Sequence, residues 1–489
     1  MSAGRKQDGS RGWPLAPTTV RAVLSGHGIL GLAFAAVIFL VCLTGTLAVF
    51  VHDLERWEQP GQPRVDAIAP AVLERAVTAA RAGSPAQTTF YIGLPSATEA
   101  GASIIAYRPT EERAWMIAAD GALAAKHTPF ADFLLDLHIA LHLPRSWGGF
   151  VVGLAGVALL SSLVSGILAH PRIFKDAFHL RLGGARRLQE ADVHNRLGIW
   201  ALPFHLTIAL TGALLGLSTL IVGVLAMLLY RGDRAKVYAL FVDPPPAVDA
   251  RPAPPPPLGP LLAEAQGRAP GATPRQIVVE RLGRADARVT ITSERDRLLV
   301  PQDTTSFDTF GRVVKDQHPA DLAAGTRILG GIGQLHFGWF GGLPVRLLYG
   351  LLGLATCVVT SSGVTIWLAR RRDKGRPVPR WERLWSATVW GQPLALLLAA
   401  LVAAIGATMS PVWTWLAATI VLLAGARVST LPAILLSRAL RLAVALTAIL
   451  LGLIHLVREP YELTGLAIDA LLLIGGIAII AQQRRRTAA

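Results

Sequence analysis

Eight apolar runs in this chain are long enough, or nearly so, to cross a lipid bilayer, which needs about 20 helical residues. Because backbone polar groups inside a bilayer must be satisfied internally, such runs fold as helices. Hydrophobic residues make up 52% of the chain and charged residues only 16%, which excludes a large soluble protein. The sequence therefore predicts an all-α polytopic membrane protein. The runs lie at 28–51, 148–169, 198–229, 343–369, 386–408, 411–426, 439–456 and 463–482.

Lys and Arg are concentrated on one side of these spans, and loops of this kind face the cytoplasm. They occur in the loops 171–193 and 371–385 and in the tail 484–489. With eight spans both termini lie on this side, so we expect a bacterial inner-membrane protein with two periplasmic segments, 52–137 and 230–335. The net charge of +15 reflects this asymmetry. It indicates contact with an anionic lipid bilayer rather than nucleic acid, for which no motif is visible.

A motif occurs twice in the chain, which indicates an internal repeat. HGILG at 27–31 and HNRLG at 194–198 both begin an apolar run, and Thr-Gly follows at 44–45 and 211–212. Every member is offset by 167 residues. Three later glycines, Gly153, Gly156 and Gly166, match Gly350, Gly353 and Gly363 at an offset of 197. Both halves start on the same side, so the repeat is parallel and implies a pseudo-two-fold axis along the membrane normal.

The two periplasmic segments also share a layout. In each, a stretch with helical spacing, 68–83 or 257–271, is followed by short strand-like stretches. This order is typical of a helix followed by a small antiparallel sheet. The stretch 244–260 is a Pro-rich linker that we expect to be extended.

Histidines at corresponding positions in the two halves are the main candidates for chemistry, because neutral imidazole is a common axial ligand of haem iron. His27 and His194 become symmetry mates near the cytoplasmic face, and His138 and His336 become mates near the periplasmic face. Haem on the axis at each level would use all four. No CxxCH motif is present, so we predict two non-covalent b-type haems. For His27 and His194 the alternative is an interfacial histidine that reaches the headgroups.

His138 and His336 precede their apolar runs, so each needs a bent or re-entrant helix to reach a cofactor. His142 follows His138 by one helical turn and is a rival ligand, a propionate contact or an interfacial side chain. His205 lies eleven residues after His194, about 16 Å deeper near the same helix face. Its counterpart in the first half is Ile38. His205 is therefore an additional haem-site candidate or a hydrogen-bonded interior histidine, and His455 has no evident partner.

Arginines that flank the spans either pair with haem propionates or anchor the spans at the interface. They are Arg145, Arg172, Arg346 and Arg370. No dinucleotide or P-loop motif is present, so electrons would come from a quinol or a separate cytoplasmic reductase.

Several motifs together resemble the PepSY-associated transmembrane family over about residues 20–375. They are HxxLG…LTG, WEQP, LH before the second span, HNRLGIWALPFHLTIALTG and LHFGWFGGLPVRLLYGLLG…WLARR. The resemblance implies two small α+β PepSY-like modules on the periplasmic side and supports haem ligands at His27, His138, His194 and His336. Similar proteins include haem-containing reductases of ferric siderophores. The four-span tail lies outside the resemblance.

The leading hypothesis is a di-haem oxidoreductase that passes electrons outward to a periplasmic acceptor, in the first place ferric iron in a siderophore. One alternative is a haem-free regulatory or binding protein of the PepSY type, and another is a siderophore or iron transporter. The sequence carries no prediction of the oligomeric state. We divide the chain into the N-terminus 1–26, first span 27–51, module 52–137, interfacial segment and second span 138–170, basic loop 171–193, third span 194–229, module 230–335, fourth span 336–370, basic loop 371–385, tail 386–483 and C-terminus 484–489.

Overall fold

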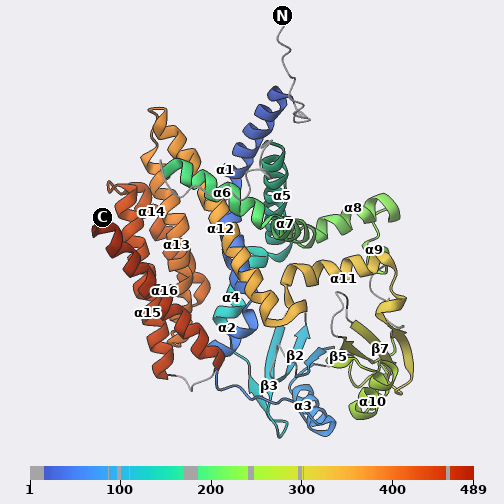
Figure 1. The fold of residues 1–489 in the computed structure, drawn as a ribbon. Coiled ribbons are helices and arrows are strands. Elements are labelled where there is room, and N and C mark those ends of the chain that lie inside the picture. The colour runs from blue at the N-terminus through green and yellow to red at the C-terminus, as the bar shows by residue number, and fades with distance from the viewer. Residues whose placement is uncertain are drawn as a thin grey trace, which may run out of the picture.

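The computed structural model of the chain describes residues 16–85, 87–95, 101–108, 111–169, 186–240, 247–295, 300, 302–458 and 463–488. Long helices form a bundle, and an antiparallel sheet lies at one end of it (Figure 1). We call this end the sheet side and the opposite end, where the N-terminus lies, the far side. The predicted fold class, a polytopic helical membrane protein with an added sheet region, is confirmed.

Seven helices are long and apolar enough to cross a membrane, and a bent pair forms an eighth candidate span, counting only the described residues. The protein is therefore a multi-pass membrane protein. The seven are α1 (Pro17–Ala48), α5 (Arg145–Ala169), α12 (Gly342–Asp373), α13 (Pro379–Ala404), α14 (Pro411–Val428), α15 (Ala433–Arg458) and α16 (Leu463–Ala488).

The third predicted span, 194–229, is not one continuous helix. It is divided among α6 (Arg186–Trp200), α7 (Leu202–Gly216) and α8 (Ser218–Tyr230), with a bend of 71° between α6 and α7. Pro203 lies in the first turn of α7, where a missing N–H is tolerated, and it cannot continue the hydrogen-bond ladder of α6. The predicted loop 171–193 lies mostly outside the described residues.

The two halves pack around each other through their matched glycines. Helix α1 contacts α5 and α12, while α7 contacts α5 and α6 contacts α12. A Cβ atom at Gly156 of α5 would lie 2.9 Å from the backbone nitrogen of Ala213, and one at Gly350 of α12 would lie 2.9 Å from the Phe50 ring. Small residues at these contacts let the helices approach closely, as is common in membranes.

The two predicted modules join into one eight-stranded sheet with the order β4-β3-β2-β1-β5-β6-β7-β8. The strands are β1 (Thr89–Gly93), β2 (Ala102–Arg108), β3 (Glu111–Ile117), β4 (Leu123–Ala125), β5 (Thr273–Glu280), β6 (Arg288–Glu294), β7 (Gln302–Asp308) and β8 (Val313–Gln317). The central pair β1–β5 is antiparallel, with Phe90 opposite Val279 and Ile92 opposite Ile277. These side chains form one core with α3 (Pro70–Ala82) and α10 (Leu258–Arg268). Burial of this shared core joins the two modules.

Short helices connect the sheet to the bundle on the sheet side. They are α2 (Val51–Glu58), α4 (Pro129–Ala140), α9 (Arg234–Tyr238), α11 (Ala324–Phe337), η1 (Pro319–Asp321) and η2 (Trp339–Gly341). Trp57 of α2 and Leu134 of α4 share a buried cluster with Leu396 and Leu451 of the tail. The C-terminal bundle α13–α16 therefore packs directly against the connecting helices.

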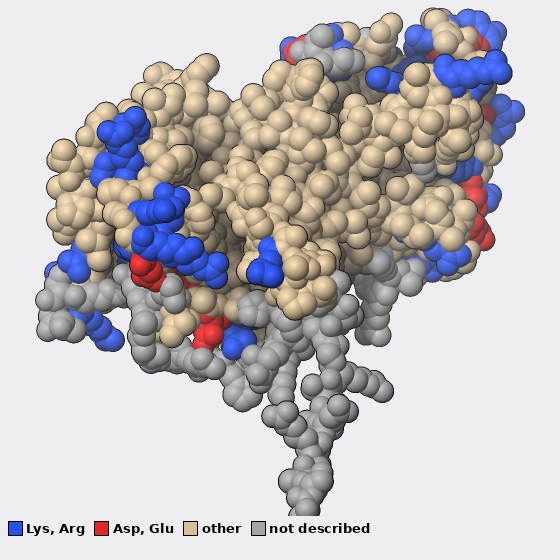
Figure 2. Space-filling model, turned by 90° about the horizontal axis from the view of Figure 1, so that it is seen from above, with Lys and Arg blue, Asp and Glu red and all other residues tan. Residues whose placement is uncertain are grey.

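Exposed Lys and Arg side chains gather at helix ends on the far side. Figure 2 views the molecule from this side and shows basic clusters beside a largely uncharged centre. Arg372, Lys374 and Arg376, at the end of α12 and in the turn after it, are exposed, as is Arg427 at the end of α14. The basic residues predicted from the loop pattern thus lie at the end of the bundle away from the sheet.

Candidate functional site

His27 of α1 and His194 of α6 lie face to edge on the far side, with ring centres 6.5 Å apart and an angle of 84° between the ring planes. The Nδ1 atom of His27 lies 2.9 Å from the carbonyl oxygen of Ser162. The Nδ1 atom of His194 lies 2.9 Å from the carbonyl oxygen of Val359. A carbonyl only accepts, so each Nδ1 carries the hydrogen and each Nε2 keeps its lone pair for a metal.

The seats of these two rings are repeated as well. Ser165 Oγ lies 3.2 Å from His27 Nδ1, and Ser362 Oγ lies 3.1 Å from His194 Nδ1. A Cβ atom at Gly166 would lie 3.5 Å from Cε1 of His27, and one at Gly363 would lie 3.2 Å from Cε1 of His194. The sequence repeat had revealed these two glycines but not the serines beside them.

His138 of α4 and His336 of α11 form the second pair, on the sheet side. Their ring centres are 6.2 Å apart, with 19° between the ring planes. The Nδ1 atom of His138 lies 3.0 Å from the carbonyl oxygen of Val41. Both histidines lie on short helices that lead into spans, which is the irregular entry their sequence positions require.

The repeated Thr-Gly pair lies where these two rings pack. Thr211 donates its hydroxyl hydrogen to the Thr207 carbonyl at 2.6 Å, and its oxygen lies 2.9 Å from His336 Nδ1. A Cβ atom at Gly212 would lie 3.0 Å from Cε1 of His336. Each repeat therefore supplies a far-side histidine and, 17 residues later, the seat of a sheet-side histidine.

The first half builds the equivalent seat with slightly different geometry. A Cβ atom at Gly45 would lie 2.6 Å from Cε1 of His138, closer than at Gly212. Thr44 Oγ1 lies 3.5 Å from His138 Nδ1, so the Val41 carbonyl is the stronger partner of this ring. Glycine is required here because any side chain would occupy the position of the imidazole.

Both pairs have the spacing that an iron with two axial imidazoles requires. Iron–nitrogen bonds of about 2 Å and roughly 1 Å from each nitrogen to its ring centre give about 6 Å between centres. The separations of 6.5 and 6.2 Å agree with this value. Within the described ranges, no group of three or more His, Cys, Asp or Glu side chains could hold a bare metal ion. Two imidazoles suit a group that brings its own equatorial ligands, as haem does.

His205 of α7 is 1% exposed, and neither ring nitrogen has a hydrogen-bond partner among the described residues. Leaving a buried polar group unsatisfied costs about 1–3 kcal/mol. The interior reading of His205 expected a hydrogen bond, and the structure places none on it. His205 lies between His194 and Thr211 along the chain, so its depth falls between the two pairs.

The other sequence candidates have protein partners. His142 Nε2 lies 2.9 Å from the Phe133 carbonyl, and its ring packs on the Phe133 ring. Arg145 pairs with Asp136 at 3.0 Å, and Arg346 pairs with Asp53. Arg370 is exposed at the end of α12, and Arg172 lies outside the described residues.

Helix α2 is a junction that sequence reasoning missed. Glu58 accepts hydrogen bonds from the backbone nitrogens of Phe130 and Ala131, at 2.6 and 3.1 Å, and so caps α4, the helix of His138. Burial raises the pKa of Glu58 to about 7, although these two hydrogen bonds oppose the shift. Asp53 of the same helix pairs with Arg346 of α12.

The tail bundle holds α2 through a buried polar network, which corrects the expectation that His455 has no partner. His455 Nδ1 lies 2.8 Å from Asp469 Oδ2, and its Nε2 lies 2.7 Å from the Trp57 carbonyl. Trp57 Nε1 donates to Asp469 Oδ1 at 2.9 Å. All three side chains are buried. Contacts this distant in sequence leave no local pattern by which they could be found.

Comparison with known proteins covers most of the histidine-bearing part of the chain. The family model of the PepSY-associated TM region matches residues 24–370. An uncharacterized protein of Pseudomonas aeruginosa is 32% identical over 257 residues, which are 50% of this chain. The match spans 64% of that relative's length.

Proposed function

We propose that this chain, which belongs to the PepSY-associated TM family, is a di-haem oxidoreductase that carries electrons across the bacterial inner membrane. The observation that carries the proposal is the pair of histidine pairs, each with ring centres about 6 Å apart and each built from both repeats. We assign His27 and His194 to one b-type haem, and His138 and His336 to the other.

The protein's part in this chemistry is to hold four imidazoles in one protonation state and one orientation. Haem, when bound, supplies one-electron redox chemistry at its iron. The Ser162 and Val359 carbonyls and the Thr211 hydroxyl each accept from an Nδ1–H group, which leaves Nε2 as the ligating atom. Axial ligation by two histidines leaves no open position for oxygen, which suits electron transfer.

The two levels divide the membrane crossing into shorter steps. His27 and Thr44, which mark the two levels on α1, are 17 residues apart, or about 26 Å at 1.5 Å per residue. This distance is close to the hydrocarbon thickness of about 30 Å. Electrons from a quinol or a cytoplasmic reductase would enter at the far side and leave at the sheet side. The basic far-side surface supports a cytoplasmic location for that side and for both termini.

We further propose that the acceptor is periplasmic ferric iron held by a siderophore, so that the activity serves iron acquisition. The sheet side carries the large soluble surface of the protein, and a water-soluble acceptor would meet the protein there.

The test is haem stoichiometry in the purified protein, with His27→Ala and His336→Ala made separately. We expect about two reducible b-type haems in the wild type and about one in each variant, because each substitution removes one axial ligand. His127→Ala is the matched control, because this residue is an exposed histidine outside both pairs. Wild-type protein that takes up no haem on reconstitution would overturn the proposal and favour a haem-free regulatory or transport role.

A further inference from the structure

A line of aromatic rings leads from the sheet-side pair to the surface. The ring of His336 is 5.9 Å from that of Phe337, centre to centre, and Phe337 stacks on Trp339 at 4.9 Å. Trp339 lies 5.1 Å from the ring of His52 on α2. Conjugated rings at such spacings shorten the saturated gaps through which an electron must tunnel.

The line ends at a recess on the sheet side. His52 lines this recess of about 420 Å³, which is open to solvent and lies between α2, the following loop and the edge of the sheet. Three cationic side chains, Arg56, Arg64 and Lys126, line it together with one carboxylate, Glu55. The recess therefore carries excess positive charge.

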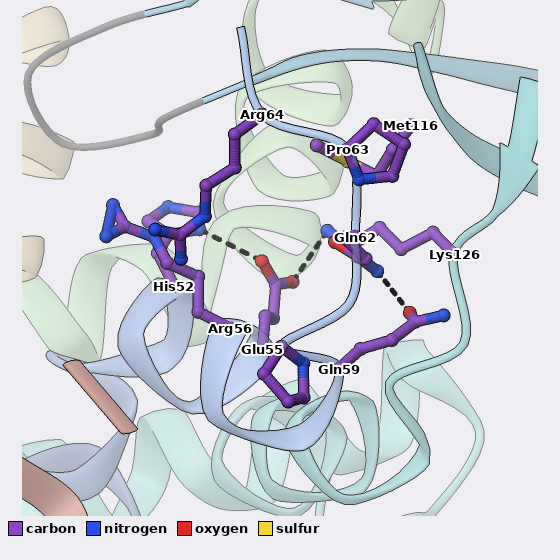
Figure 3. Close-up of a pocket in the computed structure, with 10 residues that line it drawn as sticks. His52, Glu55, Arg56, Gln59, Gln62, Pro63, Arg64, Met116 and Lys126 are labelled. Carbon is purple, nitrogen blue, oxygen red and sulfur yellow. Dashed lines mark hydrogen bonds and ion pairs between the residues drawn. The ribbon is translucent and has the colours of Figure 1, made fainter. Parts of the chain in front are cut away.

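The carboxylate is already engaged within the recess. Glu55 lies 2.9 Å from Lys126 Nζ and 3.3 Å from His52 Nδ1 (Figure 3). Burial alone would raise the pKa of Glu55, but the hydrogen bond to His52 and the charge of Lys126 hold it below its ordinary value. Glu55 therefore stays ionised and balances Lys126.

The two arginines face each other without that balance. Figure 3 shows Arg56 and Arg64 on the same wall of the recess as His52. Burial and the neighbouring charge of Arg56 lower the pKa of Arg64. Two guanidinium groups that repel each other favour an anion between them, and carboxylates suit their planar donors.

We propose that this recess binds an anionic, carboxylate-bearing ferric chelate, and that Phe337, Trp339 and His52 form the electron path to it. The proposal rests on the proposed function, because it needs a reduced iron at the sheet-side pair. One electron leaves that ferrous iron, which becomes ferric, and the chelated ferric iron becomes ferrous. No covalent bond is made or broken, and no proton is required.

The binding step is tested without electron transfer, by titrating the full-length protein with the gallium(III) complex of EDTA, an anion that is not reduced. We expect saturable, salt-sensitive binding that weakens about 10-fold or more in Arg64→Gln and in Arg56→Gln, and is largely restored in Arg56→Lys. The control is Arg113→Gln, an exposed arginine of β3 outside the recess. Wild-type affinity in both glutamine variants would refute the site.

The same charge could attract an anionic lipid headgroup, and a second arm separates the two sources. The titration is repeated with the protein in phosphatidylcholine vesicles and in phosphatidylglycerol vesicles. We expect chelate binding in both, with a modest decrease in the second from surface charge. Binding that disappears in phosphatidylglycerol while the arginine variants lose affinity for that lipid would assign the recess to lipid and overturn the proposal.

The electron path is tested by stopped-flow reoxidation of pre-reduced protein with ferric EDTA. Trp339→Leu should slow reoxidation several-fold or more while gallium-chelate binding and haem content stay unchanged. Phe340→Leu is the matched control, because Phe340 is the next residue and packs on Tyr349 instead. Equal rates in the two variants would remove the path. Haem-free protein that still binds the chelate would contradict the proposed function and leave the recess standing.

Discussion

The Nδ1 atom of His336 lies 2.9 Å from the hydroxyl oxygen of Thr211, whose own hydrogen is donated to the Thr207 carbonyl. One repeat unit thus carries a far-side histidine and, four to five helical turns later, the seat of a sheet-side histidine that arrives from another helix. The repeated Thr-Gly has a physical reason: the threonine orients an imidazole and the glycine leaves room for it.

Gly45→Ala should displace His138, because its Cβ would lie 2.6 Å from Cε1 of that ring. We expect loss of about one haem per protein, measured by pyridine haemochrome assay, with the far-side haem retained. Gly475→Ala is the control, because a Cβ there meets no atom within 4 Å. Full haem content in Gly45→Ala would contradict the role of the glycine.

Thr211→Val should lower haem affinity at the sheet side about 10- to 100-fold, the usual cost of losing a ligand's outer partner. Thr44→Val should have a smaller effect, because His138 keeps the Val41 carbonyl at 3.0 Å. Haem titration of the two apo-proteins measures the difference. Equal losses would show that the threonines act in packing rather than in hydrogen bonding.

His205→Leu should act in opposite directions in haem-free and haem-loaded protein. Without haem, removal of a buried imidazole with no partner among the described residues should raise stability by about 1–3 kcal/mol. With haem, the change should destabilise the protein if the bound group supplies the missing hydrogen bond. Thermal unfolding of both forms gives the two signs, and a gain in both would exclude His205 from the haem environment.

Glu58 makes folding pH-dependent through the capping of α4. Its folded pKa of about 7 lies above the ordinary value, so the folded state binds the proton more tightly than the unfolded state. The resulting stability, roughly 3 kcal/mol at most, is complete below about pH 4.5 and is lost as pH rises through 7. Glu58→Gln should flatten the melting temperature between pH 5 and 8. Glu74→Gln, which alters the carboxylate that caps α10, should leave the wild-type pH dependence in place.

Asp469→Ala should destabilise the protein by about 3–5 kcal/mol, because it leaves the Trp57 and His455 donors buried without an acceptor. Melting temperature in detergent measures the loss. The control Asp469→Asn keeps one acceptor oxygen and should lose less. If the tail merely covers the connecting helices, the two variants will melt alike.

The spans could be predicted because each is a local property: a run of apolar residues must be helical in lipid. The break at Pro203 was visible in the sequence, yet the run 198–229 was read as one span because apolarity alone does not reveal a bend. The joining of two modules through β1 and β5 had no local signal, since it depends on pairing between strands about 180 residues apart.

The repeat determined by itself which four histidines correspond and at which two levels they lie, because constant offsets translate directly into symmetry. Only the tertiary structure decided what surrounds them. The serine, threonine and glycine seats, the α2 junction and the line from His336 to His52 all join residues from different helices. Side-chain distances across such contacts depend on how helices pack, and helix packing is set by the whole bundle rather than by any one segment.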